Sequence, residues 1–108
     1  MHISTSYSIS EMAAEFGVTL RTLRFYEGRG LLSPARNGMA RVYSEADRAR
    51  FRKIHTWAGQ GFTLAEIKAA LAHGGFDRAQ IIQQIADLRR RRDEADRAIA
   101  ALLLQVAA

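Results

Sequence analysis

The fold is decided by residues 8–26, which read SISEMAAEFGVTLRTLRFY. Ser8 and Glu11 form a capping-box pattern, in which a hydroxyl and a carboxylate three residues later satisfy the first backbone N–H groups of a helix. Apolar residues at helical spacing follow, and Gly17 is typical of a helix end. Thr19 then caps a second helix. Two helices of about eight to ten residues joined by a tight turn predict a helix-turn-helix.

The stretch after these two helices predicts a short β-hairpin. Pro34 disfavours a helical restart, and Asn37-Gly38 is a strong signal for a hairpin turn. We predict two strands, Leu32–Ala35 and Arg41–Tyr43, with a basic loop between them. A hairpin in this position is a wing. Before the first helix, residues 1–6 show no periodicity, so no element is predicted there.

Three further helices are predicted after the wing. The first spans Glu45–Ala58, and the second ends near Ala72. The third can run to the C-terminus. The predicted N-caps of the three helices are Ser44, Thr63 and Asp77. The predicted buried side of the first of them includes Ala49, Ile54 and Trp57.

The last helix carries an uninterrupted heptad seam, in which seven of eight positions are apolar. A helix of about 30 residues is roughly 45 Å long, which exceeds what a domain this small can cover. We therefore expect the seam to pair with a second copy of the chain. The alternative is that the helix folds back on its own domain. The seam residues are Ile81, Ile85, Leu88, Arg92, Ala95, Ile99, Leu102 and Val106.

The position of Arg92 favours an antiparallel pair. An antiparallel pair centred between Arg92 and Ala95 sets a long side chain against a small one, so that the guanidinium can reach water or a neighbouring Asp. A parallel pair would stack Arg92 on its own copy, which is repulsive at close range. The predicted fold class is therefore mostly α: a winged helix-turn-helix with a small β wing, followed by a long C-terminal helix that forms an antiparallel coiled coil in a dimer.

Composition excludes several classes of protein. The 108 residues contain no cysteine, which excludes disulfide frameworks, thiolate metal sites and cysteine nucleophiles. No apolar run is long enough to span a membrane, and no signal-peptide pattern is present, so we expect a cytoplasmic protein with no membrane partner. His2, His55 and His73 are scattered, with no carboxylate at ligand spacing. We expect no metal, no cofactor and no enzymatic activity.

Positive charge is concentrated in the first part of the chain. Residues 1–62 hold nine Arg or Lys and five acidic residues, whereas residues 63–108 hold seven and six, which together give the net charge of +5. A basic first part joined to a nearly balanced second part favours a nucleic-acid surface attached to another kind of surface. The alternative is a basic surface that serves solubility.

Many spaced positions between Tyr7 and Leu71 resemble the MerR family of bacterial transcription regulators. The long helix after them is similar to the antiparallel dimerisation helix of that family. The matching positions are Thr19-x-Arg21-Thr22-Leu23-Arg24-Phe25-Tyr26-Glu27, Gly30-Leu31-Leu32, Pro34-x-Arg36, Arg41-x-Tyr43-Ser44, Asp47 and Gly61-Phe62-Thr63-Leu64-x-Glu66-Ile67.

The resemblance implies a homodimer on double-stranded DNA, at a pseudo-palindromic promoter operator that the protein bends and untwists so that RNA polymerase can engage. It divides the chain into a DNA-binding domain, residues 1–75, and a dimerisation helix, residues 76–108. Because the sequence stops where that helix ends, we expect no separate effector domain in it. The sequence identifies neither a small-molecule effector nor the operator, and it does not distinguish an activator from a repressor.

The candidate DNA contacts come from the second helix and the wing. Arg21 and Arg24 share one helix face, where a guanidinium can take guanine O6 and N7 or a phosphate. Relatives use arginines placed like Arg36 and Arg41 on phosphates, and Tyr43 matches a phosphate-contacting position. The full predicted set is Thr19, Arg21, Thr22, Arg24, Tyr26, Arg36, Arg41 and Tyr43. Tyr26 and Tyr43 could equally be core aromatics, and we expect Arg48, Arg50, Arg52 and Lys53 to form a solvated face.

One departure from the family pattern concerns the second wing. Relatives usually carry Arg or Lys just before its Gly-Phe pair, whereas residues 55–60 offer only His55 as a possible cation. Two other classes of function stay open: an architectural or excisionase-like DNA-binding protein, and a helical interaction module that binds no DNA. The heptad helix favours the regulator over the architectural protein, because small architectural relatives often lack it.

Overall fold

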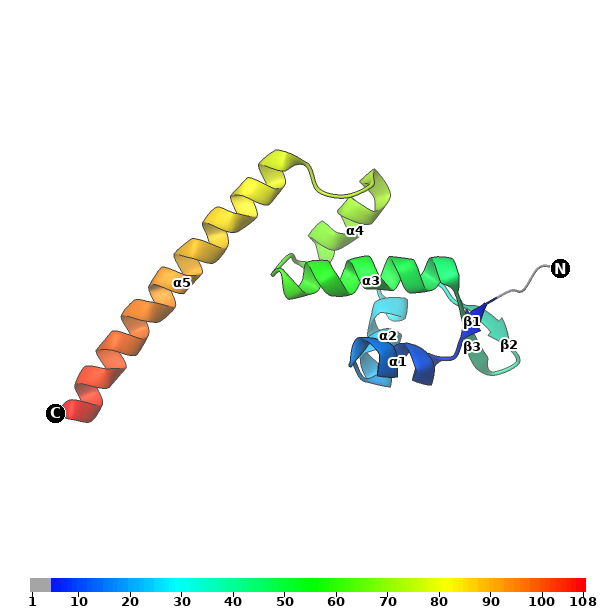
Figure 1. The fold of residues 1–108 in the computed structure, drawn as a ribbon, viewed down its shortest axis with the longest axis horizontal. Coiled ribbons are helices and arrows are strands. Elements are labelled where there is room, and N and C mark those ends of the chain that lie inside the picture. The colour runs from blue at the N-terminus through cyan, green and yellow to red at the C-terminus, as the bar shows by residue number, and fades with distance from the viewer. Residues whose placement is uncertain (1–4) are drawn as a thin grey trace. The chain divides into compact units, whose positions relative to one another are not determined.

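The computed structural model describes residues 5–108 (Figure 1). Its contacts divide the chain into two compact units, of which the first ends at Gln60 and the second spans Gly61–Ala108. The first unit holds the helix-turn-helix, a small sheet and one longer helix, and the second holds two helices. The mostly helical winged fold with a long C-terminal helix is confirmed.

The helix-turn-helix forms as the sequence predicts. Helix α1 spans Ile9–Phe16 and begins with the reciprocal capping box between Ser8 and Glu11. Gly17 ends it in the left-handed conformation, with φ of +64°, which costs a glycine little. Helix α2 spans Leu20–Gly28, so the two helices are separated by a turn of three residues.

The sheet has three strands, one more than predicted. Strand β1 is Ser6–Tyr7, β2 is Ala35–Asn37 and β3 is Ala40–Ser44. Their order is β1-β3-β2, and both pairings are antiparallel. The prediction that residues 1–6 contain no element is therefore wrong at Ser6. The sequence could not show this strand, because two residues are too few to show any alternation. Residues 1–4 of that segment lie outside the described residues.

The first wing strand begins at Ala35, not at Leu32 as predicted. Leu31 and Leu32 are 1% exposed, so they serve the core and not the hairpin. Pro34 has no N–H to give to a strand partner, which explains why pairing begins after it. The two-residue turn is residues 38–39, with positive φ at Gly38 only, the pattern of a type II′ turn.

Helix α3 spans Glu45–Gly59 and supplies the centre of the first core. Phe51 and Ile54 are fully buried, whereas Ala49, predicted as buried, is exposed and Trp57 is half-buried. The prediction for Ala49 is wrong because the buried stripe of the helix runs through Phe51. The ring of Phe51 meets Phe16 edge-on, with centroids 4.9 Å apart.

The second unit is built from helix α4, Leu64–His73, and helix α5, Arg78–Ala107. Thr63 and Asp77 cap these helices as predicted, each through a reciprocal capping box. The loop before α4 passes close to α5: a Cβ built on Gly61 would lie 3.0 Å from the Gln84 amide nitrogen. Gly61 has φ of +84°, so both its backbone and its surroundings suit glycine.

Candidate nucleic-acid interface

The N-terminus of α2 is held by two threonines of the predicted set. The Thr19 hydroxyl accepts a hydrogen bond from the backbone N–H of Thr22 at 3.1 Å, and the two hydroxyls lie 2.9 Å apart. Both hydroxyls thus serve the helix start in this structure. A base or phosphate contact by either one would add to that role or replace part of it.

Arg21 and Arg24 lie exposed on α2. Within residues 5–108, neither guanidinium makes an ion pair or a side-chain hydrogen bond with another side chain. Their donors are therefore available to an external acceptor. An exposed pair of arginines without partners, three residues apart on the second helix of a helix-turn-helix, is suited to base edges or phosphates in a DNA groove.

The wing arginines are bound to α2 through Glu27. Arg36 Nη2 donates to Glu27 Oε1 at 2.7 Å, and Arg41 Nε donates to Glu27 Oε2 at 2.5 Å. Glu27 lies in the last turn of α2, so one carboxylate ties the second helix to both strands of the hairpin. The structure thus brings Arg36 and Arg41 together beside α2, although it also gives each of them a partner within the chain.

The two tyrosines of the predicted set differ in burial. Tyr43 is 0% exposed, and its hydroxyl has no hydrogen-bond partner among the described residues. Burial raises the pKa of this hydroxyl. In this structure Tyr43 is a core aromatic, so its hydroxyl does not reach the surface where a phosphate would lie. Tyr26 is half-buried, and its ring packs against Phe51 with centroids 5.9 Å apart.

Arg48 and Arg50 are more than a solvated face. Arg48 donates to Glu15 on α1 and, at 2.8 Å, to Glu45 at the start of α3. Glu45 also accepts a hydrogen bond of 2.7 Å from the Tyr7 hydroxyl, so that this cluster joins α1, β1 and α3. Arg50 Nε donates to the Leu31 backbone oxygen at 2.6 Å and ties α3 to the loop before the wing. Both side chains therefore have structural contacts.

Sequence reasoning missed Glu27 and Phe25. Phe25 is 47% exposed on α2, and the Arg29 guanidinium lies 5.3 Å from its ring centroid, a cation–π contact. The sequence carries only a weak signal for Glu27: an acidic residue in the last turn of a helix opposes the helix dipole, which favours a cation beside it. No pattern in the sequence distinguished Phe25 from a core aromatic.

Every residue of the heptad seam is exposed along α5. The large apolar seam side chains are between 40% exposed at Leu88 and 84% exposed at Val106. Arg92 lies at the centre of the seam, and its Nη2 atom is 3.6 Å from Asp93 Oδ1, which is a weak ion pair. An apolar stripe of this length in water is unfavourable, which makes it a candidate protein–protein surface.

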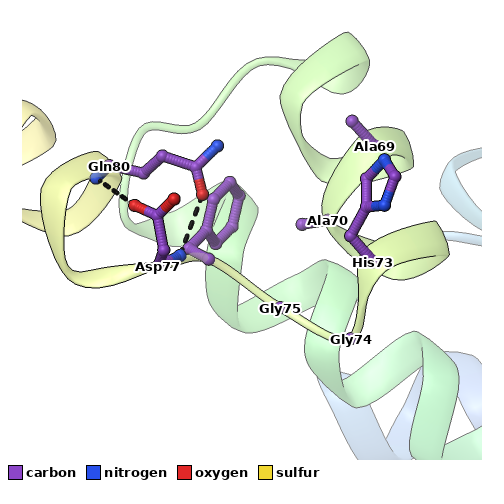
Figure 2. A pocket seen from close by; sticks show the side chains of 8 residues that line it. Ala69, Ala70, His73, Gly74, Gly75, Asp77 and Gln80 are labelled. Atoms are coloured by element: carbon purple, nitrogen blue, oxygen red, sulfur yellow. Dashed lines mark hydrogen bonds between the residues drawn. The ribbon is translucent and has the colours of Figure 1, made fainter.

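A pocket of about 400 Å³ lies between the end of α4 and the start of α5 (Figure 2). Asp77 and Gln80 line it, but they exchange two hydrogen bonds of 2.8 and 2.9 Å as the helix cap (Figure 2). His73 lines the same pocket. A single imidazole is not a metal site, and residues 5–108 contain no cluster of three His, Cys, Asp or Glu side chains that could hold an ion. No helix among the described residues is long and apolar enough to span a membrane.

Comparisons with known proteins agree with this geometry. Residues 7–74 match the model of the MerR HTH family of regulatory proteins. The chain is 36% identical over 106 residues to the HTH-type transcriptional activator mta of Bacillus subtilis, which covers 93% of this chain but 41% of that protein. It is 34% identical to the HTH-type transcriptional regulator CueR of Bacillus subtilis, over 91% of this chain and 69% of that one.

A solved structure is similar over nearly the same range. The N-terminal part of the Bacillus subtilis multidrug transporter activator, MtaN, superimposes with a TM-score of 0.75 at 32% identity, over 94% of this chain and 99% of that one. The fold and these matches define a winged helix-turn-helix regulatory protein. The chain belongs to the MerR family.

Proposed function

We propose that this chain is a sequence-specific DNA-binding transcriptional regulator that binds a pseudo-palindromic promoter operator as a homodimer and bends and untwists the DNA. The observation that carries the proposal is the pair of exposed arginines without partners, Arg21 and Arg24, on the second helix of the winged motif. Membership of the family supports it. Its partners are then double-stranded DNA and RNA polymerase at the promoter, and it acts in the cytoplasm, where that DNA lies.

In this proposal α2 reads the major groove. Arg21 and Arg24 bind guanine edges or adjacent phosphates, and the hydroxyls of Thr19, Thr22 and Tyr26 contact base edges or phosphates nearby. Arg36 and Arg41 in the wing bind the DNA backbone. Tyr43 supports this surface from within the core, since its side chain is fully buried.

The dimer forms through α5. Residues 76–108 act as the dimerisation helix, and residues 1–75 as the DNA-binding domain. The exposed seam supports this division, because pairing two copies would bury the side chains that each copy leaves in water. In the antiparallel register Ile85 lies opposite Leu102, and Arg92 lies opposite Ala95.

Disulfide cross-linking tests this register directly, because the chain contains no native cysteine. The double variant with Ile85→Cys and Leu102→Cys is expected to oxidise to a covalent dimer, since the antiparallel pair sets these two positions against each other. Ile85→Cys alone is the matched control and is expected to stay monomeric on a denaturing gel. Rapid cross-linking of that single variant would indicate a parallel pair.

Footprinting tests the function as a whole. Purified protein is expected to protect an inverted repeat between the two elements of the promoter beside its own gene, with distorted central base pairs. The measurement is made at about 50 mM and about 200 mM salt, because binding to several phosphates weakens steeply with salt. Coverage that depends on salt but prefers no site would indicate an architectural protein. No binding at low salt would overturn the proposal and leave α5 as the functional surface.

A further inference from the structure

We propose that Glu27 is a positioning residue, which holds Arg36 and Arg41 side by side so that their remaining N–H groups meet the DNA backbone next to α2. This inference rests on the proposed function. It gives an acidic residue, on a surface that binds a polyanion, a role in fixing the register of the specific complex through backbone contacts.

The position of Glu27 is unfavourable by local rules. It lies in the last turn of α2, where the partial negative charge of the helix end disfavours a carboxylate. It also lies among the candidate DNA contacts, where a negative charge repels phosphate. The ion pairs with the two wing arginines offset both of these unfavourable interactions.

The wing arginines are also placed unfavourably without Glu27. Arg36 and Arg41 face each other across the antiparallel pair of β2 and β3. Like charges directly opposite each other destabilise such a pair. Because one Glu27 oxygen accepts from each guanidinium, the carboxylate offsets the repulsion and leaves the three side chains with a net charge of +1.

The hydrogen bonds leave most donors of the two arginines unused. A guanidinium carries five N–H groups, and Glu27 takes one from Arg36 through Nη2 and one from Arg41 through Nε. The Arg36 side chain is 46% exposed, whereas those of Arg41 and Glu27 are 21% and 20% exposed. The cluster is therefore partly shielded from water and still open to an acceptor. Side chains ordered in advance lose less entropy when they bind a phosphate.

A competing role for Glu27 predicts the opposite result. If the carboxylate merely occupied the arginines, phosphate would have to displace it, and removing it would strengthen every DNA complex. If it positions them, removing it weakens the specific complex, although the protein gains positive charge. The ratio of specific to nonspecific affinity distinguishes these two roles.

The experiment compares variants of the full chain on two duplexes. One duplex is that enriched by the wild-type protein from a random-sequence pool, and the other is its scrambled counterpart of equal length. Glu27→Ala is expected to lower affinity for the enriched duplex by roughly 5- to 100-fold, from the ordering of two long side chains. Its affinity for the scrambled duplex stays equal or rises, because one acid has been removed.

Glu15→Ala is the matched control. It also removes one acid and breaks an ion pair with an arginine, but that arginine is Arg48, outside the predicted interface. Its ratio of affinities for the two duplexes is expected to stay close to that of the wild-type protein. In the background Arg36→Ala with Arg41→Ala, adding Glu27→Ala is expected to leave the ratio of the two affinities unchanged, because the positioning effect passes through those arginines.

Three results would overturn the positioning role: equal or tighter binding of the enriched duplex by Glu27→Ala, a further loss in the double-arginine background, or a loss as large with Glu15→Ala. If circular dichroism shows that Glu27→Ala does not fold, Glu27→Gln is used in its place. Glu27→Gln keeps one acceptor oxygen, so an intermediate loss supports the role and an unchanged ratio overturns it. A wild-type protein that enriches no sequence refutes the proposed function itself, which is a separate outcome.

Discussion

Apolar side chains of similar size are buried in the first compact unit and exposed on helix α5. In the first unit Leu23, Phe51 and Ile54 are 0% exposed, so the unit covers its own core. In α5, Leu102 is 57% exposed and Val106 is 84% exposed, although α5 is a regular helix of 30 residues. A buried core stabilises the fold, whereas an apolar stripe that stays exposed indicates a surface that binds a partner.

The arginines show the same contrast between internal and external roles. Arg48 of α3 is bound to Glu15 on α1 and to Glu45 on its own helix, and Glu45 in turn accepts a hydrogen bond from Tyr7 of β1. Arg21 and Arg24 are exposed, with no side-chain partner among residues 5–108. The number of arginines in the sequence therefore does not predict how many can bind DNA. That depends on how many already form ion pairs within the fold.

The largest effect is expected in the core of the first unit. Phe51→Ala should lower the free energy of unfolding by about 3–5 kcal/mol, because it removes the ring that Phe16 and Tyr26 pack against. Urea denaturation measures it. Ile99→Ala on α5 is the comparison: it is expected to lower a urea midpoint that rises with protein concentration, because its seam is completed by a second copy. Midpoints that do not depend on protein concentration would show that α5 is covered within its own chain.

The next effect concerns DNA affinity. Arg24→Ala is expected to weaken binding of the enriched duplex by about 1–3 kcal/mol, because an unpaired arginine loses its base or phosphate contact. Arg52→Ala removes the same charge from α3, outside the predicted interface, and serves as the control in the same fluorescence anisotropy titration. Equal losses in the two variants would reduce the role of Arg24 to general charge.

A smaller effect is expected in the loop before α4. Gly61→Ala should destabilise the protein by about 1–2 kcal/mol, because alanine is strained at a φ of +84°. Gly17→Ala is the matched control, since Gly17 has φ of +64° but open space around its Cβ position. Thermal unfolding of both variants separates the backbone cost from the contact with Gln84. A cost at Gly61 no larger than at Gly17 would show that the contact relaxes freely.

The smallest expected effect is a dependence of stability on pH that arises from the ion pairs of Arg48. Its hydrogen bonds hold the pKa of Glu15 below the ordinary value of 4.5, and the Tyr7 hydroxyl together with Arg48 does the same for Glu45. Lowered pKa values contribute stability that is present above pH 4.5 and is lost as the pH falls through the folded-state values.

Urea midpoints from about pH 6 to about pH 3 measure this contribution. Arg48→Ala is expected to flatten the loss of stability on acidification, whereas Arg24→Ala, which breaks no ion pair, should keep the wild-type slope. A wild-type slope in Arg48→Ala would show that these pKa shifts do not depend on the arginine.

Local signals predicted most helices of the fold. The caps at Ser8, Thr19, Thr63 and Asp77 satisfy backbone groups within one turn, so the sequence alone indicates where those helices begin. Strand β1 could not be predicted in this way, because its two residues are defined by pairing with β3, more than 30 residues away.

The candidate site was predictable in its residue types but not in its contacts. Helical spacing placed Arg21 and Arg24 on one face. It could not show that Tyr43 would be fully buried, since alternation in a strand does not tell which face the core covers. Nor could it show that Glu27 joins Arg36 to Arg41, because that cluster requires the register of β2 against β3.

The central claim is that two copies of this chain read DNA through α2 and the wing. Selection of duplexes from a random-sequence pool by the purified wild-type protein, followed by sequencing, tests it most directly. The account predicts an inverted repeat, because a twofold-symmetric dimer binds two equivalent half-sites. Enrichment of a single asymmetric site, or of no sequence at all at low salt, would contradict it.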